Sequence, residues 1–389
     1  MKLSSITRSI SLLWFASQGT SRTFESSQRT CHNYSIPVNV TNVALVASYE
    51  PFTSNYDVVN FANGLAGREG GASLNLFSGQ ATKTGIYDIG ATICSPNTQS
   101  ENETTIIVAS HGLGYDRRYW DSGIEAANYS FVDFAISQGY TVFFYDRLGT
   151  GESTKVSGYE EPQSLTQVAI LRQLTILLRS GQYTGDLNSL PSKIVHVGHS
   201  YGSFISNGLI ATTPQLSDGV ILTGIAYAGV ESGALIEAFG LRIANTQAPG
   251  KWPGRDNEYV TWVDAIANVG VFFRAGSFDD EVLWYTEYVK QPIAIAELIS
   301  IGSEQIFPRR AVGFTKPVMV LSGEFDFPFC GYNCNDILDN GGETKATYFP
   351  NSSDFQAVVH PGVGHGINFS YNATGAYKAM TDYLKKNSL

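Results

Sequence analysis

Short runs of apolar and β-branched residues recur along the chain and alternate with stretches whose apolar residues have helical spacing. The strand-like runs are residues 104–110, 141–145, 193–197, 219–228, 317–321 and 356–359, and the helical stretches are 131–137, 164–180, 203–211 and 376–385. Strands that are apolar throughout are typical of parallel sheets whose two faces are both covered by helices. The sequence therefore predicts an α/β fold with a mostly parallel central sheet.

Two regions depart from this alternation. Residues 20–84 are rich in Asn, Ser and Gly, with strand-like pieces only at 43–46 and 57–61 before a predicted strand at 85–94. Residues 230–315 contain no run of the parallel-strand type, and we expect a helical lid with an apolar inner surface. Its aromatic residues are Trp252, Trp262, Phe272, Phe273, Phe278, Trp284, Tyr285 and Tyr288.

One serine lies where a predicted strand turns into a predicted helix, in Gly198-His199-Ser200-Tyr201-Gly202. Gly-x-Ser-x-Gly alone is also compatible with a tight turn. In a strand-to-helix context, however, it is typical of a nucleophile elbow, in which two glycines relieve crowding around a strained serine. We therefore expect Ser200 to be a catalytic nucleophile.

A serine hydroxyl needs a base, and the base needs a carboxylate that orients it. His365 is the expected base because glycines flank it in a loop after the last predicted strand. Asp326 follows the 317–321 strand and is the expected acid, with Glu324 as its rival. The backbone N–H groups of Leu113 and Tyr201 are the expected oxyanion donors.

Cysteines, an N-terminal segment and sequons together predict a secreted glycoprotein. Residues 1–20 combine basic residues with a short apolar run, as in a signal peptide. The four cysteines allow three disulfide connectivities, of which we favour Cys31–Cys94 and Cys330–Cys334. The glycosylation sequons are at Asn33, Asn39, Asn102, Asn128, Asn351, Asn368 and Asn372.

The charge of the chain and its Gly-rich motif argue against several classes of ligand. The net charge is −10 and no cluster of Lys or Arg occurs, which argues against nucleic acid and against an anionic membrane surface as partners. The apolar run in residues 10–16 is too short for stable membrane insertion. The Gly-rich stretch 146–153 matches neither nucleotide-binding fingerprint, so we expect it to support the site structurally. No metal or organic cofactor is predicted.

The motifs together resemble the α/β-hydrolase superfamily. They are His111-Gly112-Leu113-Gly114, the 146–153 stretch, the elbow, Gly323-Glu324-Phe325-Asp326 and Gly364-His365-Gly366, in the family's order over residues 85–389. The N-terminal features resemble the secreted fungal serine esterases and lipases of this superfamily. Epoxide hydrolases and dehalogenases are less similar, because their nucleophile is aspartate where this chain has Ser200.

The resemblance implies an α/β-hydrolase fold, with a core at 21–229 and 316–389 that is interrupted by a lid at 230–315. It implies an enzyme that cleaves carboxylic esters or lactones of small or medium apolar substrates through an acyl-enzyme. A proline-type aminopeptidase, an acyltransferase or a lyase could use the same residues, and lid carboxylates could then bind an amine. These carboxylates are Glu258, Asp279, Asp280, Glu281 and Glu287. A binding protein without catalytic activity is the alternative from a different class.

Overall fold

The computed structural model describes residues 29–67, 74–98, 104–187, 189–227, 232–301, 308–338 and 342–389. The predicted signal peptide at 1–20 and the sequon at Asn102 lie outside these residues.

An eight-stranded sheet runs through the centre of the molecule in the order β1-β2-β4-β3-β5-β6-β10-β11. The last six strands in this order are mutually parallel, and β1 and β2 are antiparallel additions at one edge. The strands are β1 (Arg29–Ala47), β2 (Phe77–Pro96), β3 (Thr105–Ser110), β4 (Thr141–Tyr145), β5 (Lys193–His199), β6 (Gly219–Thr223), β10 (Val318–Gly323) and β11 (Phe355–His360). The predicted parallel strands are therefore present, although β6 ends five residues earlier than expected.

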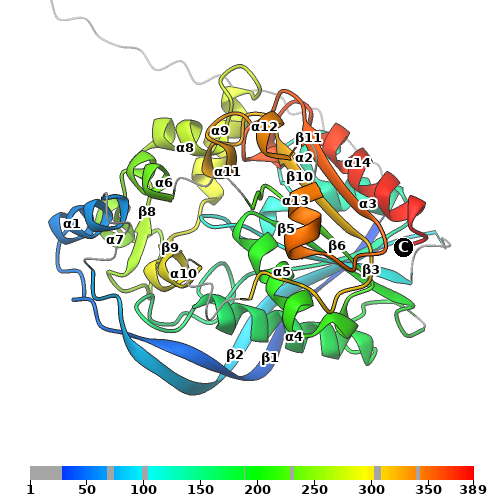
Figure 1. Ribbon diagram of the computed structural model, residues 1–389, viewed down its shortest axis with the longest axis horizontal. Helices are drawn as coiled ribbons and strands as arrows, with labels where there is room; N and C mark the ends of the chain where they lie inside the picture. The colour runs from blue at the N-terminus through cyan, green and yellow to red at the C-terminus, as the bar shows by residue number, and fades with distance from the viewer. Residues whose placement is uncertain are drawn as a thin grey trace, which may run out of the picture.

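Helices cover both faces of this sheet (Figure 1). Helices α3 (Phe131–Ser137) and α14 (Ala373–Lys386) pack on one face, and α4 (Ser164–Arg179) and α5 (Tyr201–Thr212) pack on the other. Strand β3 shows why both layers are needed. Its Ile107 joins the apolar cluster under α3 and α14, whereas the adjacent Ile106 joins the cluster under α4 and α5. Successive residues of a strand point to opposite faces, so an entirely apolar strand needs two covers.

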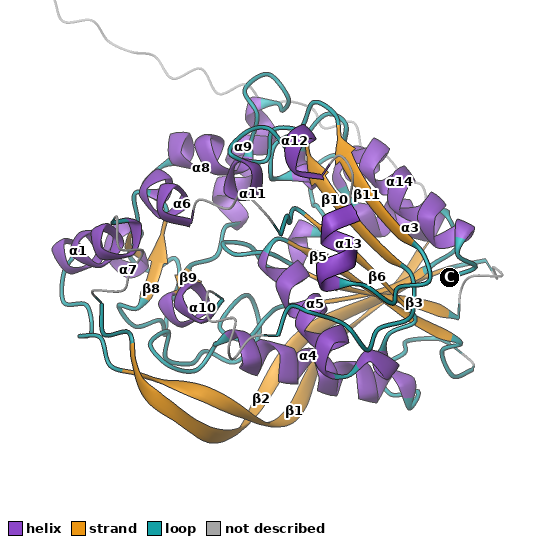
Figure 2. Ribbon diagram, viewed as in Figure 1, coloured by secondary structure: helices purple, strands orange, loops and turns teal. Residues whose placement is uncertain are grey.

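The N-terminal region forms a long antiparallel hairpin of β1 and β2, which bends away from the body of the sheet (Figure 2). In β1, Ile36, Val38 and Val40 are buried and the residues between them are exposed, as expected for a strand with one covered face. The strand expected at 57–61 is wrong, because these residues lie in helix α1 (Asn55–Ala66). A capping box between Ser54 and Asp57 starts this helix.

Residues 232–301, called the cap below, connect β6 to β10. The cap contains helices α6 (Ser232–Phe239), α7 (Ala244–Gln247), α8 (Ala265–Phe272), α9 (Asp280–Val289) and α10 (Ile295–Ser300). It is not purely helical as predicted, because β7 (Arg242–Ile243), β8 (Tyr259–Thr261) and β9 (Ile293–Ala294) form a small antiparallel sheet. These strands of two or three residues are too short to show a period-2 pattern. The assignment of the cap as a separate domain remains a prediction.

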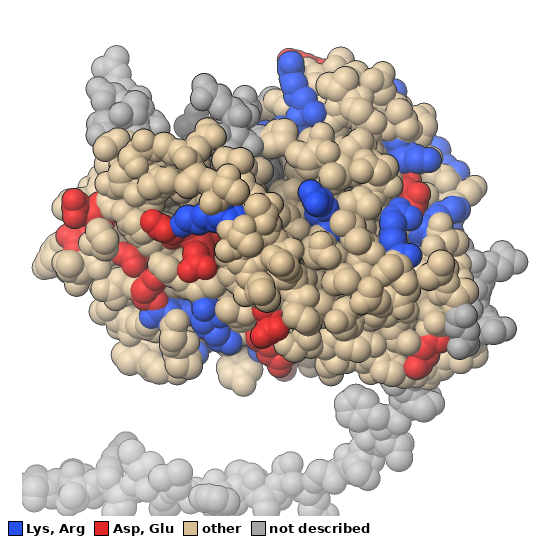
Figure 3. Space-filling model, turned by 90° about the horizontal axis from the view of Figure 1, so that it is seen from below, with Lys and Arg blue, Asp and Glu red and all other residues tan. Residues whose placement is uncertain are grey.

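Short helices complete the connections between the main elements. They are α2 (Ala126–Tyr129), α11 (Phe327–Cys330), α12 (Asn335–Leu338), α13 (Gly342–Tyr348) and the 3₁₀ turns Arg117–Tyr119, Pro214–Leu216 and Ile367–Phe369. Among the helices that the structure describes, none has the length and apolar character needed to cross a bilayer. On the face seen in Figure 3, basic side chains are interspersed with acidic ones.

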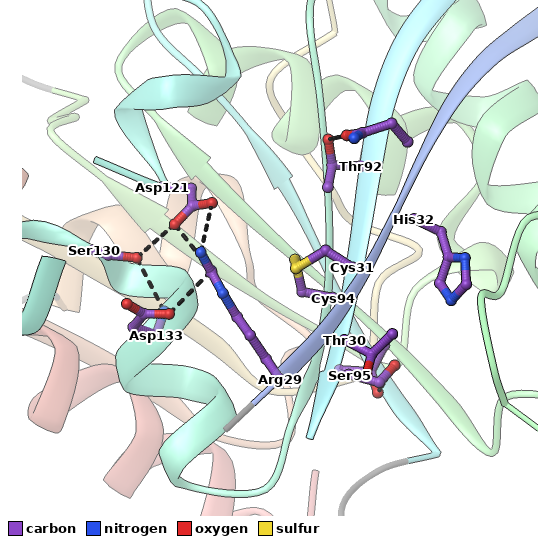
Figure 4. Close-up of a disulfide and its surroundings, with 12 residues drawn as sticks. Arg29, Thr30, Cys31, His32, Thr92, Cys94, Ser95, Asp121, Ser130 and Asp133 are labelled. Atoms are coloured by element: carbon purple, nitrogen blue, oxygen red, sulfur yellow. Dashed lines mark hydrogen bonds and ion pairs between the residues drawn. A yellow bond between two sulfur atoms is a disulfide. The ribbon is translucent and has the colours of Figure 1, made fainter. Parts of the chain in front are cut away.

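Two disulfides join the cysteines in the favoured pairing. Cys31–Cys94 crosses between β1 and β2, and Cys330–Cys334 closes a short loop after β10. Close to the first disulfide, Arg29 makes ion pairs at 3.0 Å with Asp121 and Asp133 (Figure 4). The start of β1 is thus attached covalently to β2 and electrostatically to α3 and to the segment before it.

We predict that removing Cys31–Cys94, by changing both residues to alanine, lowers the free energy of unfolding by about 4 kcal/mol. The two cysteines are 63 residues apart, so the crosslink removes much conformational entropy from the unfolded chain. The matched change at Cys330–Cys334, with a separation of 4, should cost about 2 kcal/mol. Denaturant titrations of both double variants measure the difference, and equal losses would contradict this account.

Candidate active site

Ser200 lies between β5 and α5 in a backbone conformation that a serine rarely adopts, with φ 54° and ψ −120°. The neighbouring glycines allow very close approaches. A Cβ atom at Gly202 would lie 2.1 Å from the carbonyl oxygen of Ser110, and one at Gly198 would lie 2.4 Å from Cα of Ser203. The Ser200 N–H donates to the carbonyl of Thr223 at 2.8 Å. The predicted strand–elbow–helix geometry is therefore present at this serine.

His365 and Asp326 contact one another directly. Nδ1 of His365 lies 2.6 Å from Oδ2 of Asp326, and both side chains are almost completely buried. The other oxygen of Asp326 accepts the Phe329 N–H at 3.0 Å, which holds the carboxylate in place. The rival acid Glu324 instead accepts the Gly362 N–H at 2.9 Å, so it braces the loop before His365.

Ser200 and His365 approach the same turn, Thr223-Gly224 at the end of β6. Ser200 hydrogen-bonds to Thr223, as described above. At Gly224, which has φ +57°, a Cβ atom would lie 3.1 Å from Cε1 of His365 and 2.6 Å from Cε1 of His199. Ser200 follows β5, Asp326 follows β10 and His365 follows β11. These strands lie in the consecutive order β5-β6-β10-β11, so their carboxyl ends bring the predicted nucleophile, acid and base to one edge of the sheet.

The other histidines have different partners. His199 stacks on Tyr119 at 4.3 Å between ring centroids, and burial together with nearby His365 lowers its pKa well below the usual range. Burial and Arg147 likewise lower the pKa of His111, and burial lowers the pKa of His196 to about 3. The remaining two lie elsewhere, with His32 against Asp186 and His360 against the carbonyl of Asn372.

The loop His111-Gly112-Leu113-Gly114 lies against the elbow. A Cβ atom at Gly112 would be only 3.0 Å from Cβ of Ser200. Leu113 follows directly in the chain, and Tyr201 is the first residue of α5, where N–H groups have no acceptor within the helix. Of the two predicted oxyanion donors, Tyr201 thus follows Ser200 in the chain, and Leu113 belongs to a loop that lies against Ser200.

The cap contacts the loop of the predicted base and the loop of the predicted oxyanion donor Leu113. The Gly366 N–H donates to the carbonyl of Phe272 at 2.5 Å, and the Phe272 ring lies 5.6 Å from the His365 ring. A Cβ atom at Gly114 would lie 2.3 Å from the Trp262 ring. Trp252, Trp262, Phe272 and Phe273 are buried, whereas Trp284 and Tyr288 are largely exposed.

The sequons differ in accessibility. Asn368 is only 3% exposed and its Nδ2 donates to the carbonyl of Tyr119 at 2.9 Å, so the folded structure argues against a glycan there. The described sequons with exposed side chains are Asn33, Asn39, Asn128, Asn351 and Asn372. As for metal ions, no group of three or more His, Cys, Asp or Glu side chains suited to a metal occurs within the described ranges.

The Gly224→Ala variant should lose about 2–4 kcal/mol of unfolding free energy, because the new methyl group must displace both the His199 and His365 rings. Gly250→Ala is the matched control. Gly250 also has positive φ, but a Cβ atom there would meet nothing within 4 Å, so only backbone strain of about 1 kcal/mol is expected. Denaturant unfolding of both variants tests this difference, and an equal cost would mean that the turn does not confine the two rings.

Comparisons with known proteins were made for both sequence and structure. A search among curated protein sequences returned no match. Solved structures that resemble this one include a thermophilic esterase from Thermogutta terrifontis, 17% identical, with a TM-score of 0.52 over 77% of this chain and 94% of that chain. A putative lipase from Acinetobacter baumannii is 14% identical, with a TM-score of 0.52 over 77% and 89% of the two chains.

A putative non-heme bromoperoxidase from Mycobacterium tuberculosis is 18% identical, with a TM-score of 0.51 over 77% of this chain and 96% of that chain. These likenesses show the fold. A model of the alpha/beta hydrolase family matches residues 106–374, which include the elbow, the cap and the positions of Asp326 and His365. Because this match spans more than half of the chain, the chain belongs to the alpha/beta hydrolase family, and the predicted fold and superfamily are confirmed.

Proposed function

We propose that the protein is a serine hydrolase that cleaves carboxylic esters or lactones. Membership of the family supports a hydrolase activity in general. The observation that carries the finer proposal is the strained elbow at Ser200, which borders the same Thr223-Gly224 turn as the buried His365–Asp326 pair. The same elements are found in enzymes that pass through an acyl-enzyme intermediate.

In the proposed mechanism, Oγ of Ser200 attacks the ester carbonyl carbon while its proton passes to Nε2 of His365. Asp326 stabilises the imidazolium that forms, because its carboxylate faces Nδ1 at 2.6 Å. The N–H groups of Leu113 and Tyr201 stabilise the oxyanion. The imidazolium then protonates the leaving alcohol, and a water molecule activated by His365 hydrolyses the acyl-enzyme.

Apolar substrates are favoured by the surroundings of the base. Phe272 and Phe329 each lie 5.6 Å from the His365 ring, and the cap buries Trp262 against the loop that carries Leu113. Aromatic walls of this kind suit an apolar acyl or alcohol group. We therefore propose esters or lactones of small or medium apolar groups as substrates.

The aminopeptidase alternative needs a lid carboxylate that is free to bind an amine. Glu258 accepts the Phe52 N–H at 2.8 Å, and Glu287 accepts from Trp262 and pairs with Lys290. The other three carboxylates, Asp279, Asp280 and Glu281, line a surface pocket together with Glu125 and Tyr371. The bonds of Glu258 and Glu287 leave neither carboxylate free for an amine, which favours the esterase over a peptidase that would use them. An acyltransferase or a lyase could use the same residues as the proposed hydrolase. These enzymes would differ from it in the nucleophile that attacks or in the group that leaves.

Secretion remains a prediction. The two disulfides support an oxidising compartment, since such bonds rarely persist in the cytosol. The exposed sequons are compatible with the same location.

Purified wild-type protein should hydrolyse p-nitrophenyl esters of short and medium acyl chains, and a fluorophosphonate probe should label Ser200. Ser200→Ala should lower kcat by about 10⁴-fold or more, because no other group there can carry the acyl chain. Proline arylamides assayed in parallel separate ester from peptide chemistry. Turnover of arylamides alone would replace the esterase with the peptidase, and no labelling of folded protein would favour a binding protein.

Asp326→Asn should lower kcat by about 10⁴-fold while the protein stays folded, because an amide no longer holds His365 in the required tautomer. Glu324→Gln is the matched control, since this side chain accepts a backbone N–H of the adjacent loop instead of contacting the imidazole. Its kcat should fall less than tenfold. Steady-state ester kinetics on both variants decide between the two carboxylates, and the reverse ranking would make Glu324 the acid.

A further inference from the structure

Arg147 is a fully buried cation two residues after the end of β4, and it lies against Tyr201 of the elbow. Its guanidinium donates from Nε to the carbonyl of His111 and from Nη2 to the carbonyl of Gly112, both at 3.1 Å. Its Nη1 makes an ion pair with Glu297. A buried arginine that donates to two backbone carbonyls and to a carboxylate holds these groups in fixed relative positions.

The bond to Gly112 bears directly on the oxyanion donor. The Gly112 carbonyl and the Leu113 N–H belong to one planar trans peptide unit and point in opposite directions. Fixing the carbonyl oxygen therefore fixes the direction of the N–H. His111 adds a second donor to the same oxygen, because its Nε2 accepts the Arg147 N–H at 3.0 Å and its Nδ1 lies 2.9 Å from the Gly112 oxygen.

Arg147 also contacts the residue that carries the other donor. Its guanidinium carbon lies 4.7 Å from the centre of the Tyr201 ring. The Tyr201 hydroxyl lies 3.1 Å from Oγ of Ser164, so the ring is held at both ends. One side chain thus touches the loop of Leu113 and the side chain of Tyr201.

The counter-ion of Arg147 comes from the cap. Glu297 lies on α10, is 1% exposed, and accepts a further hydrogen bond from Nε2 of Gln167 at 3.0 Å. A buried guanidinium without such a carboxylate would be strongly destabilising. The position of Arg147 against the oxyanion loop therefore depends on the docking of α10.

We propose that Arg147, paired with Glu297 of the cap, is a positioning residue that aligns the two oxyanion donors and couples their geometry to the closed cap. This inference rests on the proposed serine hydrolase function. Arg147 acts on the oxyanion through the peptide unit of Leu113 and through Tyr201, and its charge is neutralised by Glu297.

The test compares Arg147→Lys with the wild type in ester turnover and in inhibition by a matched pair of ketones. With a trifluoromethyl ketone, a bond forms between Ser200 Oγ and the carbonyl carbon. The carbonyl π pair moves onto oxygen as an oxyanion, and the serine proton passes to His365. The methyl ketone with the same hydrocarbon substituent does not form this adduct readily, so its affinity measures ground-state binding. Lysine keeps the charge but cannot hold both carbonyls, so kcat should fall about 10- to 100-fold with KM changed less than threefold.

Affinity for the trifluoromethyl ketone should fall in parallel with kcat/KM, while affinity for the methyl ketone stays within threefold. A purely structural defect would weaken both ketones alike. Arg255→Lys is the matched control, because Arg255 is also buried, donates to a backbone carbonyl of the 146–153 loop at 2.7 Å and lies over a tyrosine ring. It should lose stability but keep its ratio of ketone affinities.

The inference is overturned if folded Arg147→Lys keeps the wild-type kcat and ketone ratio, or if both lysine variants change alike. Glu297→Gln decides if Arg147→Lys does not fold. It keeps the shape of the side chain but removes its charge, and a fall in kcat of about tenfold with a matching loss of trifluoromethyl ketone affinity is expected. An unchanged ratio in folded Glu297→Gln overturns the proposal. Failure of the proposed function would be distinct, because the wild type itself would then hydrolyse no ester.

Discussion

The close packing of the elbow against the end of β3 is the constraint on which the site depends. Ser200 holds a strained backbone conformation, and strain of this kind costs about 1–3 kcal/mol. Contacts with the surrounding sheet must therefore hold Ser200 in this conformation. They do so because Gly202 lies in contact with the carbonyl of Ser110 and because Gly112 touches Ser200 itself. A Cβ atom at Gly202 would lie 2.1 Å from the Ser110 carbonyl oxygen, so a side chain there would push the elbow away from the end of β3.

The cap contributes to the geometry of the site as well as covering it. Phe272 accepts the N–H of Gly366 beside the expected base, Trp262 fills the space left open by Gly114, and Glu297 neutralises Arg147. Three separate parts of the cap thus contact the loop of the predicted base, the loop of Leu113, and Arg147, which binds the loop of Leu113. A displaced cap would disturb the alignment of donors and base together, and not only the boundary of the substrate pocket.

Local patterns predicted the elbow, because its glycines, the preceding β5 run and the following α5 helix are adjacent in the chain. The acid and base could be selected because each follows a strand of the same sheet. The β1–β2 hairpin was predicted only in part. The strand at 85–94 and the piece at 43–46 lie within β2 and β1, but most of β1 was missed, where Val38 and Val40 alternate with polar residues and Pro37 interrupts the pattern. Helix α1 was misassigned because the Ser54–Asp57 capping box was not recognised.

The sequence predicted that the 146–153 stretch supports the site, but not the pairing of Arg147 with Glu297, because Glu297 lies 150 residues further along the chain. Only the fold brings these two residues together. The burial of Asn368 could not be predicted either. Its sequon resembles the others in sequence, and only the fold brings its amide to the carbonyl of Tyr119.

The electrostatics of the site follow from which charges are paired. His111 and His199 are buried and their pKa values are lowered, so both are neutral near pH 7. Arg147 is neutralised by Glu297, and the buried side chains of His365 and Asp326 face one another at 2.6 Å. In the proposed reaction, the developing oxyanion would therefore be stabilised mainly by oriented backbone N–H groups. Such stabilisation depends on the direction of the dipoles, so small rotations of one peptide unit should matter more here than changes in net charge.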